Sequence, residues 1–307
     1  MVWFEKRRER PSQEAASNYY SGSQAEPPPY QQAADAAGNS FRFSPAANAS
    51  YDSHTMALRF QRQFPPETHP RFLSAADRER CLSQGLPAAR LVYPPRYSQS
   101  TRGAEAMWDY GHQPNENVVF LTPTTAQFRY AMDSSVQTDL PLPCTLDHSP
   151  FAVDRFVVTV IGKAPATVVA VGLASKPYPP FRLPGWNLES VGYHSDDGHK
   201  YHNDPMGGRT YGPTFGRSGD AIEVEYTTAS GQVVYSLNGR SLGPAFFNVR
   251  GPLYPTIGAD GPCQLQVQYL PSQPTDPGPK AGAPAYQFSD RPPSPQASEP
   301  PPPYSAL

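Results

Sequence analysis

The sequence predicts an all-β fold, a β-sandwich of two antiparallel sheets, for residues 136–270. Apolar and polar residues alternate along Ile222–Tyr226 and Leu265–Tyr269, the pattern of a strand with one buried and one wet face. Val233–Leu237 runs into Asn238-Gly239, a strong hairpin signal because both turn residues tolerate positive φ. No helical pattern interrupts these strands, which disfavours an α/β enzyme fold. Further strands are expected at Phe156–Val160, Thr167–Leu173, Val191–His194, Arg240–Leu242 and Leu253–Ile257.

A short helical lead-in is expected ahead of the sandwich, in residues 70–135. The clearest helix lies within residues 70–86, where Ser74 can cap the first turn and Asp77 follows three residues later. This spacing resembles a capping box, with Asp in place of the usual Glu. Gly85 can end the helix. The rest of the lead-in is expected to be extended chain.

Both flanks of the predicted domain are expected to be disordered. The 39 prolines and 23 glycines make up about one fifth of the 307 residues, which approaches the share in low-complexity chains. The N-terminal flank, residues 1–69, begins with a long stretch rich in Ser, Ala, Gln, Asn and Pro, and 12 of the 37 residues in 271–307 are proline. Such segments bury too little apolar surface to offset their ordering entropy, and they favour extended polyproline II conformations.

Charge and cysteine content exclude several classes of protein. The formal net charge of −2 is not that of a nucleic-acid binder. Cys81, Cys144 and Cys263 are few, odd in number and far apart, so they support neither a disulfide framework nor a structural zinc site and fit a reducing, cytosolic environment. No apolar run approaches the roughly 18 residues of a membrane-spanning helix. No cofactor is expected.

Three PPxY motifs carry the first functional signal: Pro27-Pro28-Pro29-Tyr30, Pro94-Pro95-Arg96-Tyr97 and Pro301-Pro302-Pro303-Tyr304. Prolines hold the chain in polyproline II before binding, so less entropy is lost when a WW domain accepts them in its aromatic-lined groove. One match could arise by chance in a chain with 39 prolines and 18 tyrosines, but two PPPY copies in opposite flanks favour WW ligands. Tyr97 could instead serve packing. Linked motifs favour a partner with several WW domains, because avidity then raises the apparent affinity.

A second candidate is the cluster of histidines and aspartates in residues 194–204. His194, His199 and His202 beside carboxylates could ligate zinc or iron. However, Asp196-Asp197-Gly198 is typical of a hairpin turn, which would place His194 and His202 on paired strands, and the spacing of known zinc motifs is missing. A structured polar hairpin is therefore favoured. Because no other enzyme signature occurs, we predict no catalytic site, no metal site and no enzyme.

Two longer segments resemble a known family. Ala170–Trp186, with the run Lys-Pro-Tyr-Pro-Pro-Phe-Arg-Leu-Pro-Gly-Trp, and Ser190–Asp204 resemble a SPRY domain of the Ran-binding-protein-M-like branch. The pattern continues in Tyr211–Phe215, the Asn238-Gly239 hairpin and Leu253–Gly258. Over residues 70–270 the chain is similar to fungal endosomal and vacuolar SPRY adaptors, which recruit a HECT-type ubiquitin ligase with WW domains to membrane cargo. The resemblance therefore implies a SPRY β-sandwich.

The resemblance also implies a non-catalytic adaptor. The PPxY motifs would engage the ligase, the SPRY loops would contact a membrane-protein cargo or a cargo adaptor, and the ligase would ubiquitylate that cargo for endosomal sorting and vacuolar degradation. The candidate partner-binding residues in the SPRY loops are Trp186, Tyr201, Tyr211 and Phe215, any of which could instead fill the core. The alternatives are a SPRY scaffold subunit of a multi-subunit ubiquitin ligase and a metal-binding enzyme built on the His194–His202 cluster.

The start of the chain departs from this family, whose adaptors usually carry an N-terminal transmembrane helix. Phe4–Arg10 is rich in basic residues and would suit the cytoplasmic flank of a helix just upstream, because basic residues stay inside. We therefore expect a truncated sequence, and the alternative is a soluble paralogue. The resemblance implies a location on the cytosolic face of the endosome or vacuole membrane, reached through the upstream helix or through partners.

Overall fold

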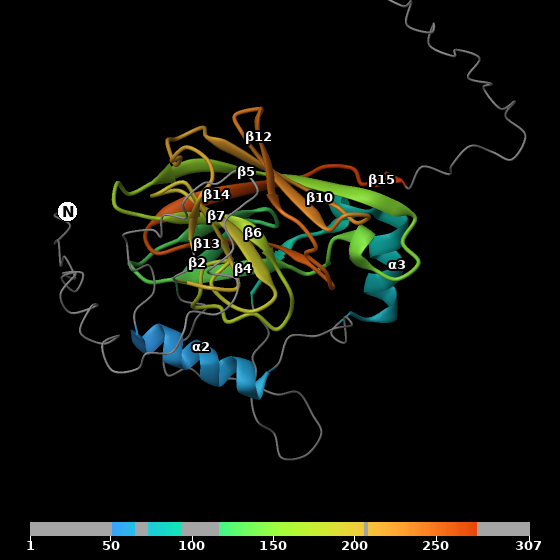
Figure 1. The fold of residues 1–307 in the computed structure, drawn as a ribbon, viewed down its shortest axis with the longest axis horizontal. Helices are drawn as coiled ribbons and strands as arrows, with labels where there is room; N and C mark the ends of the chain where they lie inside the picture. The colour runs from blue at the N-terminus through green and yellow to red at the C-terminus, as the bar shows by residue number, and fades with distance from the viewer. Residues whose placement is uncertain (1–50, 65–72, 94–116, 206–207, 275–307) are drawn as a thin grey trace, which may run out of the picture. The chain divides into compact units, whose positions relative to one another are not determined.

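The computed structural model describes residues 51–64, 73–93, 117–205 and 208–274, which form two antiparallel sheets (Figure 1). The seven-stranded sheet has the order β1-β4-β13-β6-β7-β8-β9. The eight-stranded sheet has the order β12-β11-β10-β5-β14-β3-β2, and β15 pairs with β5 beside this path. The expected all-β sandwich of two antiparallel sheets is confirmed.

Most strands are five to seven residues long, and β5 is the longest with 13 residues. The seven-stranded sheet contains β1 (Leu91–Val92), β4 (Ser134–Thr138), β13 (Tyr254–Ala259), β6 (Val169–Ala174), β7 (Ser190–His194), β8 (His199–His202) and β9 (Arg209–Thr210). The eight-stranded sheet contains β12 (Arg240–Phe246), β11 (Gln232–Leu237), β10 (Ala221–Thr227), β5 (Phe151–Lys163), β14 (Cys263–Tyr269), β3 (Thr125–Phe128), β2 (Val118–Thr122) and β15 (Gln273–Pro274). Two single turns of 3₁₀-helix, η2 (Leu86–Ala88) and η4 (Pro143–Thr145), join elements.

The predicted hairpin turn at Asn238-Gly239 connects β11 to β12. Its two residues have φ of 51° and 78°, which is the positive φ that a two-residue hairpin turn requires. Asn238 also accepts a hydrogen bond from the Ala221 backbone N–H at 2.8 Å. The local sequence therefore specifies this turn. All of the strands expected from the sequence are present, with ends shifted by a few residues.

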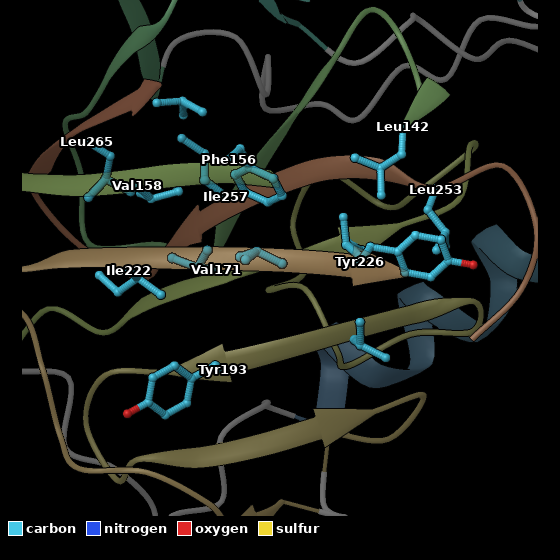
Figure 2. Packing of buried hydrophobic residues seen from close by; sticks show 14 of the residues in the cluster. Leu142, Phe156, Val158, Val171, Tyr193, Ile222, Tyr226, Leu253, Ile257 and Leu265 are labelled. Carbon is cyan, nitrogen blue, oxygen red and sulfur yellow. The ribbon is translucent and has the colours of Figure 1, made fainter. Parts of the chain in front are cut away.

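The main core lies between the two sheets (Figure 2). The eight-stranded sheet contributes Phe156 and Val158 from β5, and the seven-stranded sheet contributes Val171, Tyr193 and Ile257. Each is at most 1% exposed. Alternation puts every second residue of β5, β10 and β14 into this core, which explains why these strands were recognisable from the sequence.

The seven-stranded sheet is buried on its outer face as well. Every residue of β4, β6, β7 and β13 is buried. Val171 of β6 faces the main core, whereas its neighbour Ala170 belongs to a second apolar cluster with Leu183, Trp186 and Tyr201. Two of these four residues come from the loop between β6 and β7. We call residues 175–189 the covering segment, because they bury the outer face of the sheet.

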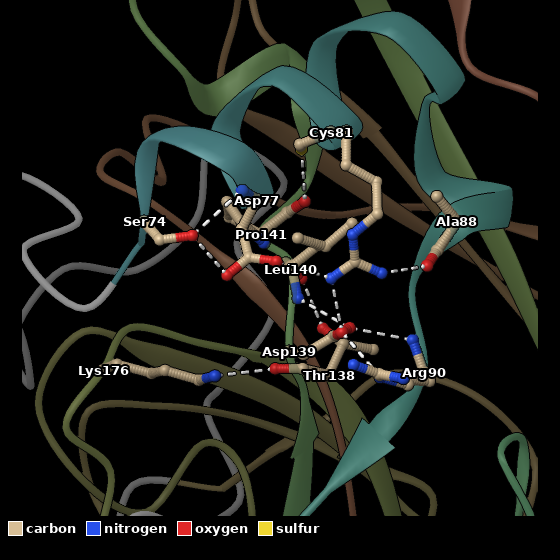
Figure 3. A network of polar contacts seen from close by, with 11 residues as sticks. Ser74, Asp77, Cys81, Ala88, Arg90, Thr138, Asp139, Leu140, Pro141 and Lys176 are labelled. Atoms are coloured by element: carbon tan, nitrogen blue, oxygen red, sulfur yellow. Dashed lines mark hydrogen bonds and ion pairs between the residues drawn. The ribbon is translucent and has the colours of Figure 1, made fainter.

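The predicted helix is α3 (Ala75–Gln84). The Ser74 hydroxyl oxygen accepts from the Asp77 backbone N–H at 3.1 Å, and Gly85 has φ of 70° at the C-cap. Arg80 of this helix donates to Asp139 at 2.7 Å, and Asp139 also accepts from the Arg90 side chain at 3.1 Å (Figure 3). These contacts attach α3 to the end of β4.

The structure corrects the predicted boundaries of the domain. Disorder through residue 69 is wrong for α2 (Tyr51–Gln63), a helix whose Phe60 is fully buried. The part of the lead-in that was expected to be extended contains β2 and β3, which pair into the eight-stranded sheet. The C-terminal flank was expected to be disordered from residue 271, yet β15 pairs with β5. Strands β2, β3 and β15 obtain their hydrogen bonds from neighbouring strands that are distant in the sequence, so no local pattern predicts these pairings.

Candidate protein-interaction site

The three predicted WW-ligand motifs lie outside the described residues. This holds for the motifs that end at Tyr30, Tyr97 and Tyr304. Their role as WW ligands therefore stays a prediction based on the sequence.

Three of the four predicted SPRY-loop contact residues are buried. The exposed fraction is 3% for Trp186, 0% for Tyr201 and 7% for Phe215. Trp186 and Tyr201 fill the outer apolar cluster, and Phe215 packs against Tyr193 with ring centroids 4.9 Å apart. These three rings fill the core, which is the alternative that the sequence left open, and their direct contact with a partner stays a prediction.

The fourth residue, Tyr211, is half-buried and joins neighbouring strands. Its hydroxyl donates to the Gly243 carbonyl at 2.6 Å and accepts from the Tyr235 backbone N–H at 3.2 Å. Burial raises the pKa of Tyr211 to about 12, so the phenol stays protonated and keeps its donor. Tyr211 therefore stabilises the β11–β12 end of the eight-stranded sheet.

The covering segment lies very close to the seven-stranded sheet at two glycines, where any larger residue would clash with it. A Cβ on Gly192 would lie 2.1 Å from the Pro184 carbonyl oxygen, and a Cβ on Gly258 would lie 2.9 Å from a methyl of Leu183. Both glycines are on the outer face of the seven-stranded sheet. The absence of side chains at these positions lets residues 183–186 lie directly on the backbone.

Arg182 is the most unusual residue of the covering segment, because its charged side chain is 0% exposed. Its Nε donates to Asn187 Oδ1 at 2.8 Å, and its Nη1 donates to Ser53 Oγ at 2.9 Å. The guanidinium also lies 4.9 Å from the centre of the Trp186 ring. These partners are neutral, so no carboxylate satisfies the guanidinium directly.

Two buried N–H donors near this residue have no hydrogen-bond partner among the described residues: Arg182 Nη2 and Trp186 Nε1. His194 lies against Trp186 with ring centroids 5.5 Å apart. Its Nε2 is 2.9 Å from the Pro184 carbonyl, which can only accept, so Nε2 carries the proton. A buried donor without an acceptor is unfavourable, and such atoms indicate a site that a ligand could complete.

Helix α2 contributes to this site from far away in the sequence. Besides the hydrogen bond from Arg182 to Ser53, Phe60 packs edge-on against Phe181 with ring centroids 6.3 Å apart. Ser53, Ala57 and Phe60 are buried, whereas Met56 and Leu58 are exposed. The buried positions follow i, i+4 and i+7, which is one face of a helix.

Asp133, in the loop before β4, is one of two carboxyl groups whose charge acts on Arg182; the other is Asp204. The Ser135 backbone N–H donates to the Pro180 carbonyl at 2.8 Å, which ties this loop to the covering segment. Burial raises the pKa of Asp133 to about 7, and the charge of Asp260 acts in the same direction while Arg182 opposes it. Asp133 is therefore partly protonated near neutral pH and compensates Arg182 only weakly.

The histidine cluster forms the hairpin that the sequence predicted. Val191 of β7 pairs with His202 of β8. His194 is enclosed, and burial lowers its pKa to about 4, while His199 Nδ1 lies 3.0 Å from the Asp197 carbonyl oxygen. Within residues 51–64, 73–93, 117–205 and 208–274, no three His, Cys, Asp or Glu side chains are grouped so that they could hold a metal ion.

Arg182, Ser53 and Asp133 are not among the site residues predicted from the sequence. One signal was present, because Arg182 is the only charged residue in Pro177–Trp186, a run of prolines, aromatics, Leu and Gly. A lone charge in such a run can be buried. Nothing in the sequence indicates that α2 provides its partner.

Comparison with known proteins identifies the domain. Residues 155–270 match the family model of the SPRY domain. This part of the chain is therefore similar to a SPRY domain. A crystal structure of a human SPRY domain is 23% identical, with 50% of this chain and 94% of that chain covered and a TM-score of 0.43.

Curated proteins that the chain resembles are fungal. Protein ssh4 of Aspergillus clavatus is 34% identical over 58% of this chain and 36% of its own length. A SPRY domain-containing protein of Schizosaccharomyces pombe is 37% identical over 52% of this chain and 40% of its own length. The chain thus spans little more than a third of these relatives. In the described part of the chain, no helix has the length and apolarity needed to cross a membrane.

Proposed function

We propose that the chain is a non-catalytic adaptor, which recruits a HECT-type ubiquitin ligase through its PPxY motifs. The SPRY domain binds a membrane-protein cargo or a cargo adaptor, and the ligase then ubiquitylates that cargo. Ubiquitylated cargo is sorted at the endosome and degraded in the vacuole. The adaptor acts on the cytosolic face of these membranes.

One observation carries the proposal: two PPPY motifs, ending at Tyr30 and Tyr304, stand on either side of a SPRY domain. SPRY domains are protein-interaction modules, and WW domains read such proline motifs. A chain with both kinds of element can hold two proteins together. Its similarity to fungal Ssh4 proteins supports the same assignment, because it extends beyond the SPRY match.

Affinity purification with mass spectrometry tests the proposal in fungal cells. We expect the tagged chain to retain a WW-domain ligase together with membrane proteins. The triple variant Tyr30→Ala, Tyr97→Ala, Tyr304→Ala should lose the ligase and keep the cargo. The matched control changes Tyr19 and Tyr286 to Ala, because these tyrosines are in the same flanks without a preceding Pro-Pro. Retention of the ligase by the triple variant would contradict the proposal.

A further inference from the structure

Helix α2 packs on the covering segment in the way that a peptide helix lies in a groove. Ser53, Ala57 and Phe60 are its buried anchors at i, i+4 and i+7, the pattern by which grooves read amphipathic helices. Ser53 accepts from Arg182 at 2.9 Å, and Phe60 lies edge-on to Phe181. The covering segment therefore presents both a polar and an aromatic contact to a helix.

The polar half of this contact is incomplete. A guanidinium presents parallel N–H donors that match the two oxygens of a carboxylate. Here Nη1 donates to a serine hydroxyl, and Nη2 has no acceptor among the residues that the structure describes, although Arg182 is 0% exposed. A carboxylate at the position of Ser53 would satisfy both nitrogens and add a charged hydrogen-bond partner to a guanidinium whose hydrogen bonds within the described residues go to the neutral Asn187 and Ser53.

We propose that Phe181 and Arg182 form a docking site for an amphipathic helix of a partner protein, and that α2 fills this site in the free chain. The partner helix carries Asp or Glu at the position of Ser53, a small residue four positions later and an aromatic residue seven positions later. Its carboxylate pairs with both terminal nitrogens of Arg182, and its aromatic ring packs on Phe181.

Helix α2 is suited to be displaced. It has 13 residues, and isolated helices shorter than about 12–15 residues are marginal in water. Its anchors are a serine, an alanine and one phenylalanine, while Met56 and Leu58 are 36% and 42% exposed. This proposal rests on the proposed function in one respect, because it takes the SPRY domain as the part that binds a partner. Its test contains no ligase, so it can fail without affecting ligase recruitment.

The test uses the full chain and a fluorescent peptide with the sequence of residues 50–64, measured by anisotropy. Ala57→Glu places a charge on the buried face of α2 and should free the site, whereas Leu58→Glu on the exposed face is the matched control. We expect the Ala57→Glu chain to bind the peptide at least about tenfold more tightly than the control chain, in which α2 still competes. A Ser53→Asp peptide should bind the Ala57→Glu chain roughly tenfold more tightly again, since it gains a charge-assisted hydrogen bond.

Two results would overturn the proposal. One is an Ala57→Glu chain that unfolds cooperatively like wild type yet binds neither peptide. The other is a Ser53→Asp peptide that binds no more tightly than a Ser53→Ala peptide. If Ala57→Glu does not fold, Phe60→Ser takes its place, because it removes the Phe181 contact without adding charge. Neither failure would affect ligase binding by the PPxY motifs, which is measured separately.

Discussion

Arg182 is fully buried, and one of its contacts comes from a part of the chain that is far away in the sequence. Its hydrogen bond to Ser53 spans 129 positions of sequence. No local pattern can reveal such a contact, because α2 and the covering segment meet only in the folded chain. Trp186, for which the sequence allowed either a loop contact or a place in the core, is enclosed in the fold.

His194 makes a prediction about acid stability. Burial lowers its pKa from 6.5 to about 4. The unfolded chain therefore binds a proton between these values while the folded chain does not, so this residue favours unfolding as the pH falls from 6.5 to about 4. We expect His194→Gln to lose less unfolding free energy than wild type over this range.

Denaturant unfolding at several pH values measures this difference. Gln keeps an amide N–H for the Pro184 carbonyl and cannot be protonated. Asp133, whose pKa is raised to about 7, has the opposite pH dependence, but it is common to both proteins and cancels in the comparison. If the unfolding free energies of wild type and His194→Gln depend on pH in the same way, the lowered pKa of His194 is contradicted.

At the scale of elements, the sequence predicted strands best where one face of the strand is buried and the other is more exposed to solvent. Alternation in β10 and β14 and the Asn-Gly turn after β11 identified these elements, because each of their signals is local. Strand β4, Ser134–Thr138, is buried on both faces although four of its five residues are polar. Its burial comes from the covering segment and from pairing with β13, which no local pattern encodes.

Helix α2 was missed for a related reason. Of its thirteen residues, YDSHTMALRFQRQ, few are strongly apolar, so its apolar face is narrow. Its burial depends on Phe181 and Arg182 of the covering segment. Helix α3, by contrast, was predictable because Ser74 and Gly85 mark its ends in the sequence.

The close packing of β6 and β7 predicts a strong effect at Gly172. A Cβ there would lie 1.9 Å from the Val191 carbonyl oxygen, whereas a Cβ on Gly162 of β5 would meet nothing within 4 Å. Gly172→Ala should lower the unfolding free energy by about 1–3 kcal/mol or more, because two strands must move apart. Gly162→Ala should stay within about 1 kcal/mol of wild type. Thermal and denaturant unfolding check both variants, and equal effects would contradict the described register.

The attachment of α3 to the sheet predicts a second local effect. Asp139 accepts from the side chains of Arg80 and Arg90 and from two backbone N–H groups, of Arg90 and Leu140. Asp139→Ala should lower the unfolding free energy by about 2 kcal/mol, because the partly buried Arg80 keeps only Asp77 of its two carboxylate partners and the Arg90 and Leu140 N–H groups lose their acceptor. The exposed Asp147 provides the control, since only its backbone carbonyl accepts from Arg78. Protection of α3 amides from hydrogen exchange should fall in Asp139→Ala alone, and unchanged protection would count against this anchor.

For the whole molecule, sequence and structure inform different parts of the candidate function. The PPxY motifs are recognisable because a WW ligand is a short linear signal. The helix-docking site needs the fold, since it combines α2, the covering segment and the outer face of the seven-stranded sheet. In the proposed function, ligase binding and partner binding depend on different parts of the chain, so we expect that each can be removed without the other.

Avidity between the two flanking motifs gives a prediction for the intact chain. Linked sites can raise the apparent affinity for a multivalent partner by about 10²–10⁴ when geometry allows. We expect Tyr304→Ala to weaken binding to a protein with several WW domains far more than binding to a single WW domain. Equal losses against both would show that the motifs act one at a time.

The most direct test of the adaptor account is the affinity of the purified full chain for the tandem WW domains of a HECT-type ligase, measured by isothermal titration calorimetry. The account predicts tight binding by wild type and by the Tyr19→Ala, Tyr286→Ala control. It predicts that the variant with Tyr30, Tyr97 and Tyr304 changed to Ala shows no measurable binding while its SPRY domain unfolds as in wild type. Undiminished binding by that triple variant would contradict the central claim.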